Sequence, residues 1–328
     1  MNPRSRSRVL PLAALLLLLL AACTRQEPRP PLRIAVNVWP GYDTLWLADQ
    51  LGYTAEEGVA VRILTTDGLG ASRRLFKLEE ADLFGGTLVE LIASSLSDGR
   101  DPRAVALLDV SLGPDVILGR PGLADFADLR GRRVGIEPGT SDLLLLAAAL
   151  RARGLAPGDV QEVNVSHQSK LEALRSGQVD AVCSYPPESE ETIRATGARV
   201  LLSSADVPGT IIDVLIAGAD TIRNRAGEIT ALLRANQRAV AALRNDPAAR
   251  RLLARRGGVT EEELARQLAG IELPGLPDQP ARFAPGGSVH VAAEGAVRAL
   301  RDYGALPRDI PAGSLLEPAM LRAALVPR

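Results

Sequence analysis

The sequence contains few of the residues on which catalytic and metal sites usually depend. Among 328 residues there are two histidines, His167 and His290, and two cysteines, Cys23 and Cys183. A zinc cluster built from thiolates is therefore excluded. The sequence also lacks a Gly-x-Ser-x-Gly elbow, a His-Glu-x-x-His motif and a P-loop lysine. We accordingly expect no metal, no cofactor and no enzymatic activity.

An excess of charge of either sign is also absent. The chain has 38 Lys and Arg against 39 Asp and Glu, and its only lysines are Lys77 and Lys170. Because nucleic-acid binding requires a basic surface, no nucleic acid is expected as a partner. Beyond the N-terminal residues, no apolar run reaches the ~20 residues that a membrane-spanning helix needs. The most apolar stretch, residues 143–150, is too short.

The N-terminal residues have the pattern of an export signal. Basic residues at the start precede an apolar run that ends in small residues. Its last residues, Leu20-Ala21-Ala22-Cys23, resemble the lipobox of bacterial lipoproteins, in which the cysteine is lipidated after cleavage. Residues 1–22 are then a signal peptide, and residues 23–31 are the lipidated cysteine and a polar, proline-rich tether. An ordinary secretory signal with a chance cysteine is the alternative.

This signal predicts an exported lipoprotein in the periplasm or at the cell surface, anchored to a membrane through lipid on Cys23. Cys183 then has no disulfide partner within the chain. It lies in the apolar run Ala181-Val182-Cys183, so we expect a buried structural thiol. A reactive nucleophile is the alternative for Cys183.

After the tether, strand and helix patterns alternate, which predicts an α/β fold. In such sheets ligands bind beyond the carboxyl ends of the strands. A turn is expected at Gly85-Gly86, and an irregular loop at 272–287. The expected strands are 32–38, 59–65, 81–84, 104–110, 115–119, 133–136, 160–165, 179–183, 200–202 and 211–217. Beyond residue 220 the pattern is helical, with helices expected at 225–244, 247–256, 260–270, 288–302 and 314–325.

Aromatic side chains are scarce but grouped. They make up 3% of the chain, yet Trp39 and Tyr42 flank one turn directly after the first expected strand. We expect both to wall a small-molecule pocket, with packing of Trp39 in the core as the alternative. Tyr185 follows the expected strand at 179–183 and is the matching aromatic residue of the second half.

Three strand-end loops carry Gly, Ser or Thr where a helix begins. Free backbone N–H groups and the helix dipole make such positions anion sites, and ordinary helix capping is the alternative. The candidate ligand-binding residues there are Ser72, Gly85, Gly86, Thr87, Gly139, Thr140 and Ser141.

Acidic residues occur in the same loops. Asp43, Glu188 and Asp213 are candidates for ligand binding, and Asp213 or Glu188 is expected to hold an ammonium group of the ligand. His167 also follows an expected strand, but a surface position is expected for it.

Three stretches of the chain resemble one protein family. They are Asn37 to Ala48 with the following Leu51-Gly52-Tyr53, Asp128 to Gly135, and Leu174 to Ala181. They are similar to segments of the nitrate/sulfonate/taurine (and thiamine-precursor) substrate-binding proteins of ABC importers. The resemblance implies a two-lobed, type II periplasmic-binding-protein fold with the ligand in a cleft. Lobe 1 would comprise residues 32–112 and 210–328, and lobe 2 residues 113–209.

The resemblance further implies a monomeric binding protein that delivers a small anionic or zwitterionic solute, such as a sulfonate, taurine or nitrate, to an ABC permease and ATPase. Two features depart from the family pattern. Lys77 to Glu80 lacks the usual glycine, and no arginine follows a strand where it could clamp an anion. A zwitterion or a neutral heterocycle therefore stays open. The alternatives are a ligand-sensing module for a signalling partner, a binder of a thiamine-pyrimidine precursor, and a synthase-like enzyme.

Overall fold

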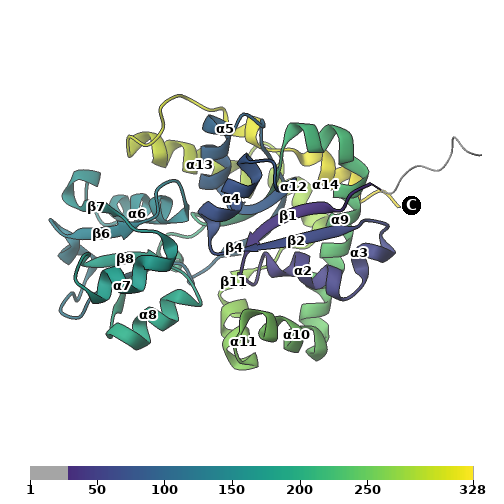
Figure 1. The fold of residues 1–328 in the computed structure, drawn as a ribbon. Coiled ribbons are helices and arrows are strands. Elements are labelled where there is room, and N and C mark those ends of the chain that lie inside the picture. Colours follow the sequence, from purple (N-terminus) through teal and green to yellow (C-terminus); the bar gives the residue numbers. More distant parts are fainter. Residues whose placement is uncertain (1–28, 328) are drawn as a thin grey trace, which may run out of the picture. The chain divides into compact units, whose positions relative to one another are not determined.

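The computed structural model describes residues 29–327, which form two β-sheets flanked by helices (Figure 1). The six-stranded sheet has the order β11-β4-β10-β3-β1-β2. Strand β1 is parallel to β2 and β3, whereas β10 is antiparallel to β3 and β4. These strands are β1 (Leu32–Asn37), β2 (Val61–Thr66), β3 (Leu83–Thr87), β4 (Arg103–Ser111), β10 (Ile212–Ala217) and β11 (Ile271–Glu272).

The five-stranded sheet has the order β7-β6-β8-β5-β9. Strand β6 is parallel to β7 and β8, and β5 is antiparallel to β8 and β9. Mixed sheets with βα connections confirm the predicted α/β class. These strands are β5 (Val116–Gly119), β6 (Arg133–Ile136), β7 (Gln161–Asn164), β8 (Ala181–Ser184) and β9 (Arg199–Ser203).

The chain passes from the first sheet to the second after β4 and returns before β10. The two passing segments are hydrogen-bonded to each other. The hydroxyl of Ser204 accepts from the N–H of Gly113 at 2.7 Å and lies 2.8 Å from the hydroxyl of Ser111. The N–H of Ser204 donates to the carbonyl of Asp115 at 2.8 Å. Whether the chain moves as two rigid lobes divided at residues 112/113 and 209/210 stays a prediction.

Helices cover both sheets. Helix α6 (Ser141–Ala152) has ten consecutive buried residues, 141–150, because it lies between its sheet and helices α5 (Leu88–Ser97) and α13 (Ser288–Asp302). Helix α9 (Ala219–Asn245) packs on α2 and α14 and departs from helical geometry at Arg225, where the predicted helix was expected to start. The others are α2 (Asp43–Gln50), α3 (Tyr53–Glu56), α4 (Leu69–Lys77), α7 (Lys170–Arg175), α8 (Glu188–Thr196), α10 (Pro247–Gly257), α11 (Glu261–Ala269), α12 (Gln279–Phe283) and α14 (Pro318–Ala324).

Three local predictions were wrong. Gly85 and Gly86 do not form a turn, because β3 continues to Thr87 and pairs with β10. Helix α4 begins at Leu69, so Ser72 lies inside the helix and not at its start. The stretch 272–287 is not wholly irregular: it contains the end of β11 and helix α12.

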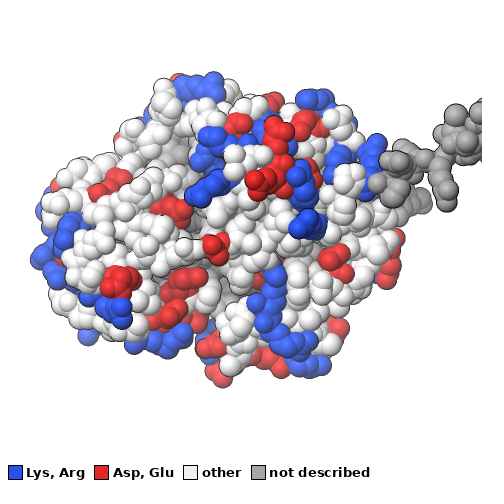
Figure 2. All heavy atoms as spheres, in the orientation of Figure 1, with Lys and Arg blue, Asp and Glu red and all other residues white. Residues whose placement is uncertain are grey.

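No helix among residues 29–327 is long and apolar enough to cross a membrane. The predicted signal peptide and Cys23 lie outside the described residues. Figure 2 shows positive and negative side chains interspersed on the face in view, in agreement with the formal net charge of −1. Cys183 is a buried free thiol, which confirms the structural position predicted for it.

Candidate ligand-binding site

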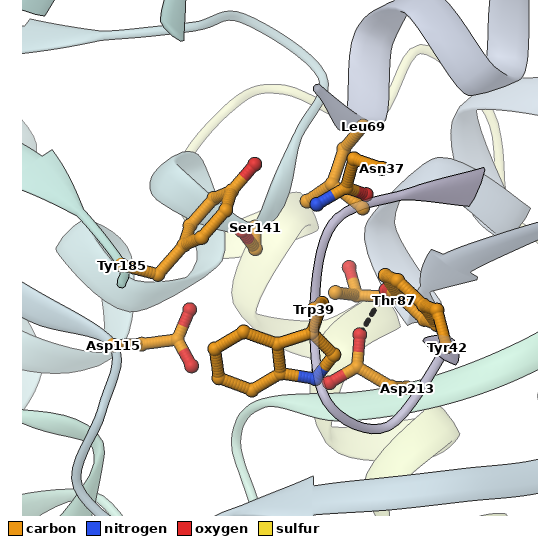
Figure 3. Close-up of a pocket in the computed structure, with 9 residues that line it drawn as sticks. All are labelled: Asn37, Trp39, Tyr42, Leu69, Thr87, Asp115, Ser141, Tyr185 and Asp213. Carbon is orange, nitrogen blue, oxygen red and sulfur yellow. Dashed lines mark hydrogen bonds between the residues drawn. The ribbon is translucent and has the colours of Figure 1, made fainter. Parts of the chain in front are cut away.

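A small cavity of about 10 Å³, called the inner cavity below, lies where the carboxyl ends of strands from both sheets meet (Figure 3). Its open space is about that of one water molecule. The first sheet contributes residues that end or follow β1 and β3 and one residue near the start of the antiparallel β10, and the second sheet contributes residues beside β5, α6 and β8. The position follows the rule that ligands bind beyond the carboxyl ends of strands in α/β sheets. The lining residues are Asn37, Trp39, Tyr42, Leu69, Thr87, Asp115, Ser141, Tyr185 and Asp213.

Aromatic rings from the two sheets meet in this cavity. Trp39 and Tyr185 make an edge-to-face contact, with ring centroids 6.0 Å apart and an interplanar angle of 82°. Tyr185 also stacks on His167 at 4.5 Å. His167 was expected at the surface, and that prediction was wrong. Its side chain is buried because it lies against Tyr185 and pairs with Glu188, 3.1 Å away.

Three buried carboxyl groups lie beside these rings. The indole N–H of Trp39 donates to Asp109 at 2.9 Å, and the Tyr42 hydroxyl donates to Asp213. In the view of Figure 3, Asp115 and Asp213 lie on either side of the Trp39 indole. Burial raises the pKa of Asp109 to about 7 and that of Asp115 to about 6. Burial and the charge of Asp109 raise the pKa of Asp213 well above its usual range.

Two of the helix N-termini predicted as anion sites are bonded to a carboxylate of the chain itself. Glu90 is fully buried and accepts from the backbone N–H of Thr87 at 2.7 Å and from its hydroxyl. Its other oxygen accepts from the N–H of Ser141 at 3.1 Å, at the start of α6. Burial raises the pKa of Glu90 to about 7. These backbone donors are therefore already engaged by Glu90.

The structure brings six of the predicted ligand-binding residues to the inner cavity. They are Trp39, Tyr42, Thr87, Ser141, Tyr185 and Asp213. The remaining predicted ligand-binding residues do not line the inner cavity; they are Asp43, Ser72, Gly85, Gly86, Gly139, Thr140 and Glu188.

Four of these residues make other contacts in the structure. Asp43 is buried against the guanidinium of Arg256. The Ser72 hydroxyl is 2.7 Å from that of Thr66. Gly85 lies directly under Tyr42, since a Cβ atom at this position would stand 2.8 Å from a ring carbon. The Thr140 hydroxyl donates to the carbonyl of Glu137 at 2.8 Å.

A second space of about 250 Å³, the outer cavity, adjoins the first and shares Asn37 and Tyr185 with it. Glu188 lines this outer cavity together with His167. The other lining residues are Val38, Thr65, Thr66, Asp67 and Gln168.

Sequence reasoning missed three residues of the inner cavity, Asn37, Leu69 and Asp115. Asn37 is the last residue of β1, and Asp115 directly precedes β5. The rule that polar residues at strand ends face a ligand could have selected Asn37. Leu69 carries no comparable signal, because its position depends on where α4 begins.

Among the described residues, no group of three or more His, Cys, Asp or Glu side chains is arranged to hold a metal ion. The geometry is that of a small, partly open pocket with aromatic walls and buried polar groups, and such a lining is typical of small-molecule binding sites.

A family model described as NMT1/THI5 like matches residues 39–250, more than half of the 328-residue chain. The chain belongs to this family. The match includes eight of the nine residues that line the inner cavity, since only Asn37 lies before it.

Two solved structures show the same periplasmic-binding-protein fold. The alkanesulfonate-binding protein SsuA of Xanthomonas axonopodis pv. citri, bound to MOPS, aligns with a TM-score of 0.71 at 17% identity, over 88% of this chain and 99% of its own. The periplasmic nitrate-binding protein NrtA of Synechocystis PCC 6803 aligns with a TM-score of 0.71 at 16% identity, over 90% of this chain and 88% of its own.

Relatives in sequence match shorter segments. A protein of Brucella abortus, provisionally named a binding protein, is 33% identical over 85 residues. The chain spans about a quarter of the length of the first curated relatives that it matches.

Proposed function

We propose that this NMT1/THI5-like protein is the solute-binding component of an ABC importer, exported and held at a membrane surface. The observation that carries the proposal is a buried cavity whose walls come from both sheets, with Trp39 of one sheet in contact with Tyr185 of the other. A solute in this cavity would be held by both sheets at once. Ligand-driven closure of two lobes is the motion by which such a protein presents a bound state to a partner.

The fold of sulfonate-binding and nitrate-binding proteins supports this proposal, and so do the relatives named as binding proteins. Binding without chemistry is the simplest use of the cavity. The thiol of Cys183 is buried, and burial raises its pKa well above the usual range, so it is a poor nucleophile. The ligand-sensing and synthase-like alternatives have no comparable feature among residues 29–327 to support them.

Among the ligands left open by the sequence, we propose a zwitterion in preference to a strict anion. Asp115 and Asp213 line the inner cavity, whereas none of its lining residues is Lys or Arg. A zwitterion such as taurine could direct its ammonium group to these carboxyl groups. Nitrate has no such group and would meet only acidic and neutral side chains.

The proposal is tested with the full chain purified in a neutral detergent. The protein is incubated with a bacterial small-molecule extract, and native mass spectrometry identifies what it retains. Small-angle scattering then measures whether the retained solute reduces the radius of gyration. A retained, unchanged solute that compacts the protein supports import. Conversion of the solute to a product would instead favour the enzyme alternative.

A further inference from the structure

We propose that the inner cavity receives a cationic group with several N–H donors, such as an alkylammonium, amidinium or guanidinium group. The inference rests on the proposed function, because it takes this cavity to be where the transported solute binds. It names the chemical class of the part of the solute that enters the cavity. It also makes Asn37 and Asp115, neither of them selected from the sequence, the residues that recognise this part.

Two buried acceptor atoms in the cavity have no hydrogen-bond partner among the described residues. They are Oδ1 of Asn37 and Oδ2 of Asp115, whose side chains belong to residues only 4% and 6% exposed. Asn37 ends β1 of the first sheet, and Asp115 precedes β5 of the second. A buried acceptor left without a hydrogen bond destabilises the protein. A ligand that donates hydrogen bonds to both sheets would remove this cost.

The carboxyl groups at the cavity are not accompanied by a Lys or Arg among its lining residues. Asp115 and Asp213 line it, and Asp109 lies behind Trp39. The positive charge of Lys170 acts on Asp115, but its ammonium forms a buried ion pair with Asp142 at 2.6 Å. That ammonium lies 5.8 Å from the centroid of the Tyr185 ring. Among the described residues, neither Asp115 nor Asp213 forms an ion pair with a Lys or Arg side chain.

The walls suit a cation for a second reason. Trp39, Tyr42 and Tyr185 are all less than a tenth exposed, so their rings are shielded from water. The face of an aromatic ring attracts a cation more strongly where the cation is shielded from water. A cation at this place favours the ionised form of the neighbouring carboxyl groups, whereas an anion favours their protonated form.

The helix N-termini do not offset this preference. Glu90 accepts from the N–H groups of both Thr87 and Ser141, so the positive ends of α5 and α6 face a carboxylate of the chain. An anionic ligand would have to displace Glu90 to reach those donors. A cationic ligand needs no such displacement.

The two cavities differ in size, and the difference fixes how the ligand lies. The inner cavity of about 10 Å³ has room for a group about the size of one water molecule, such as an ammonium, and a larger amidinium or guanidinium would have to widen it. The outer cavity of about 250 Å³ adjoins it across Asn37 and Tyr185. We therefore place the cationic head in the inner cavity and any larger or anionic part of the solute in the outer one. His167 and Gln168 line the outer cavity and could donate to that part.

The test compares five probes by thermal shift and calorimetry: agmatine, benzamidine, taurine, ethanesulfonate and nitrate. The full chain is used in neutral detergent and potassium phosphate, which contains neither an amine nor a sulfonate. Agmatine, benzamidine or taurine should raise the melting temperature, and ethanesulfonate and nitrate should not. Asp115→Asn should weaken binding of the active probe about tenfold or more. Asp206→Asn, at an exposed acid that follows β9 and lines neither cavity, is the matched control and should leave the affinity unchanged.

Each other outcome has a defined meaning. Stabilisation by ethanesulfonate or nitrate alone overturns the cationic class but leaves solute binding intact. Equal affinity of Asp115→Asn and the parent chain also overturns it. If no probe binds, the solute retained from the bacterial extract decides: a protonated nitrogen group supports the inference, and its absence refutes it. If the extract also yields no bound solute, the proposed function itself fails.

Discussion

Glu90, on α5 beside the first sheet, accepts a hydrogen bond from the backbone N–H of Ser141, the first residue of α6 beside the second sheet, at 3.1 Å. The same carboxyl group caps its own helix through Thr87. One fully buried side chain thus satisfies the N-termini of two helices that belong to different sheets. This contact therefore joins the elements that flank the two sheets.

We expect Glu90→Gln to lower the free energy of unfolding by about 1–3 kcal/mol, because the amide N–H₂ would face one of the N–H donors that the carboxylate now accepts from. Urea denaturation followed by circular dichroism measures the change. Glu263→Gln is the matched control: Glu263 forms the same capping box with Thr260 on α11, but its hydrogen bonds there are exposed. Its substitution should cost clearly less, and an equal loss in both variants would contradict the bridging role of Glu90.

The pattern of the sequence was sufficient for the fold and for part of the site. Alternating apolar residues and strand-end turns identified most strands, and the scarcity of aromatics drew attention to Trp39, Tyr42 and Tyr185, all of which line the cavity. Gly85-Gly86 was misread because pairing with β10, which is distant in sequence, decides between turn and strand. Local glycine preference carries no information about that partner.

Glu90 and Asn37 show a different kind of omission. Thr87-Leu88-Val89-Glu90 has the spacing of a capping box, which would have assigned Thr87 to its own helix before a ligand was considered. The second bond, to Ser141, could not be predicted, because it depends on how the two sheets approach. Likewise, Asn37 is an ordinary polar residue at a strand end until Tyr185 and Asp115 are placed opposite it.

The stability of the ligand-free protein should fall as pH rises from about 5.5 to 7.5. Burial raises the pKa of Glu90 and Asp109 to about 7 and of Asp115 to about 6, above the ordinary values of about 4. Between these values the folded protein binds more protons than the unfolded chain, so unfolding becomes easier with rising pH. We expect a loss of about 2 kcal/mol or more over this interval, measured as the urea midpoint at each pH.

Two further groups define the pH window. Burial raises the pKa of Asp43 to about 6 even though Arg256 opposes the shift, so it acts in the same direction. The contact with His167 lowers the pKa of Glu188 although burial opposes the shift. The stabilisation by ionised Glu188 is therefore lost only below pH 5.5, outside the interval from pH 5.5 to 7.5. Asp109→Asn should reduce the pH dependence, because one raised carboxyl is removed while an acceptor for Trp39 is kept. Stability that rises or stays constant from pH 5.5 to 7.5 would contradict the assignment.

Tyr42→Phe should weaken ligand binding while preserving the fold. The ring stays packed over Gly85, but Asp213 loses the hydroxyl that donates to it. We expect a stability loss of about 1–3 kcal/mol from the buried carboxyl group left without its partner. Calorimetry with the best probe and thermal melting measure the two effects. Tyr53→Phe, on α3 away from the cavity, is the control and should change neither ligand affinity nor stability. An unchanged ligand affinity in Tyr42→Phe would show that the Tyr42 hydroxyl does not contribute to ligand binding.

Gly85→Ala should be strongly destabilising for steric reasons. A Cβ atom at Gly85 would stand 2.8 Å from a carbon of the Tyr42 ring, closer than carbon atoms pack. Relieving that overlap must shift Tyr42 or β3, with a typical cost of about 1–3 kcal/mol and a weaker ligand affinity. Gly227→Ala, in α9 with no atom near the added carbon, is the control and should be neutral or stabilising. Equal melting temperatures for the two variants would show that the Tyr42 ring can move aside without loss of stability.

Substitution of each cysteine tests the predicted lipid anchor. If Cys23 carries the lipid, Cys23→Ser should move the protein from the membrane fraction to the soluble fraction of a bacterial host and remove the mass of the acyl groups. Dual or triple acylation holds a protein at a bilayer stably, whereas removal of all acyl chains leaves no comparable attachment. Cys183→Ala is the matched control, because Cys183 is buried in β8 and should not affect membrane association even where it lowers stability. Cys23→Ser could also stay in the membrane fraction because its signal peptide is not cleaved. The mass of the intact parent chain then decides whether the chain is cleaved and acylated. A cleaved, unacylated parent chain would refute the lipobox and leave a secreted binding protein.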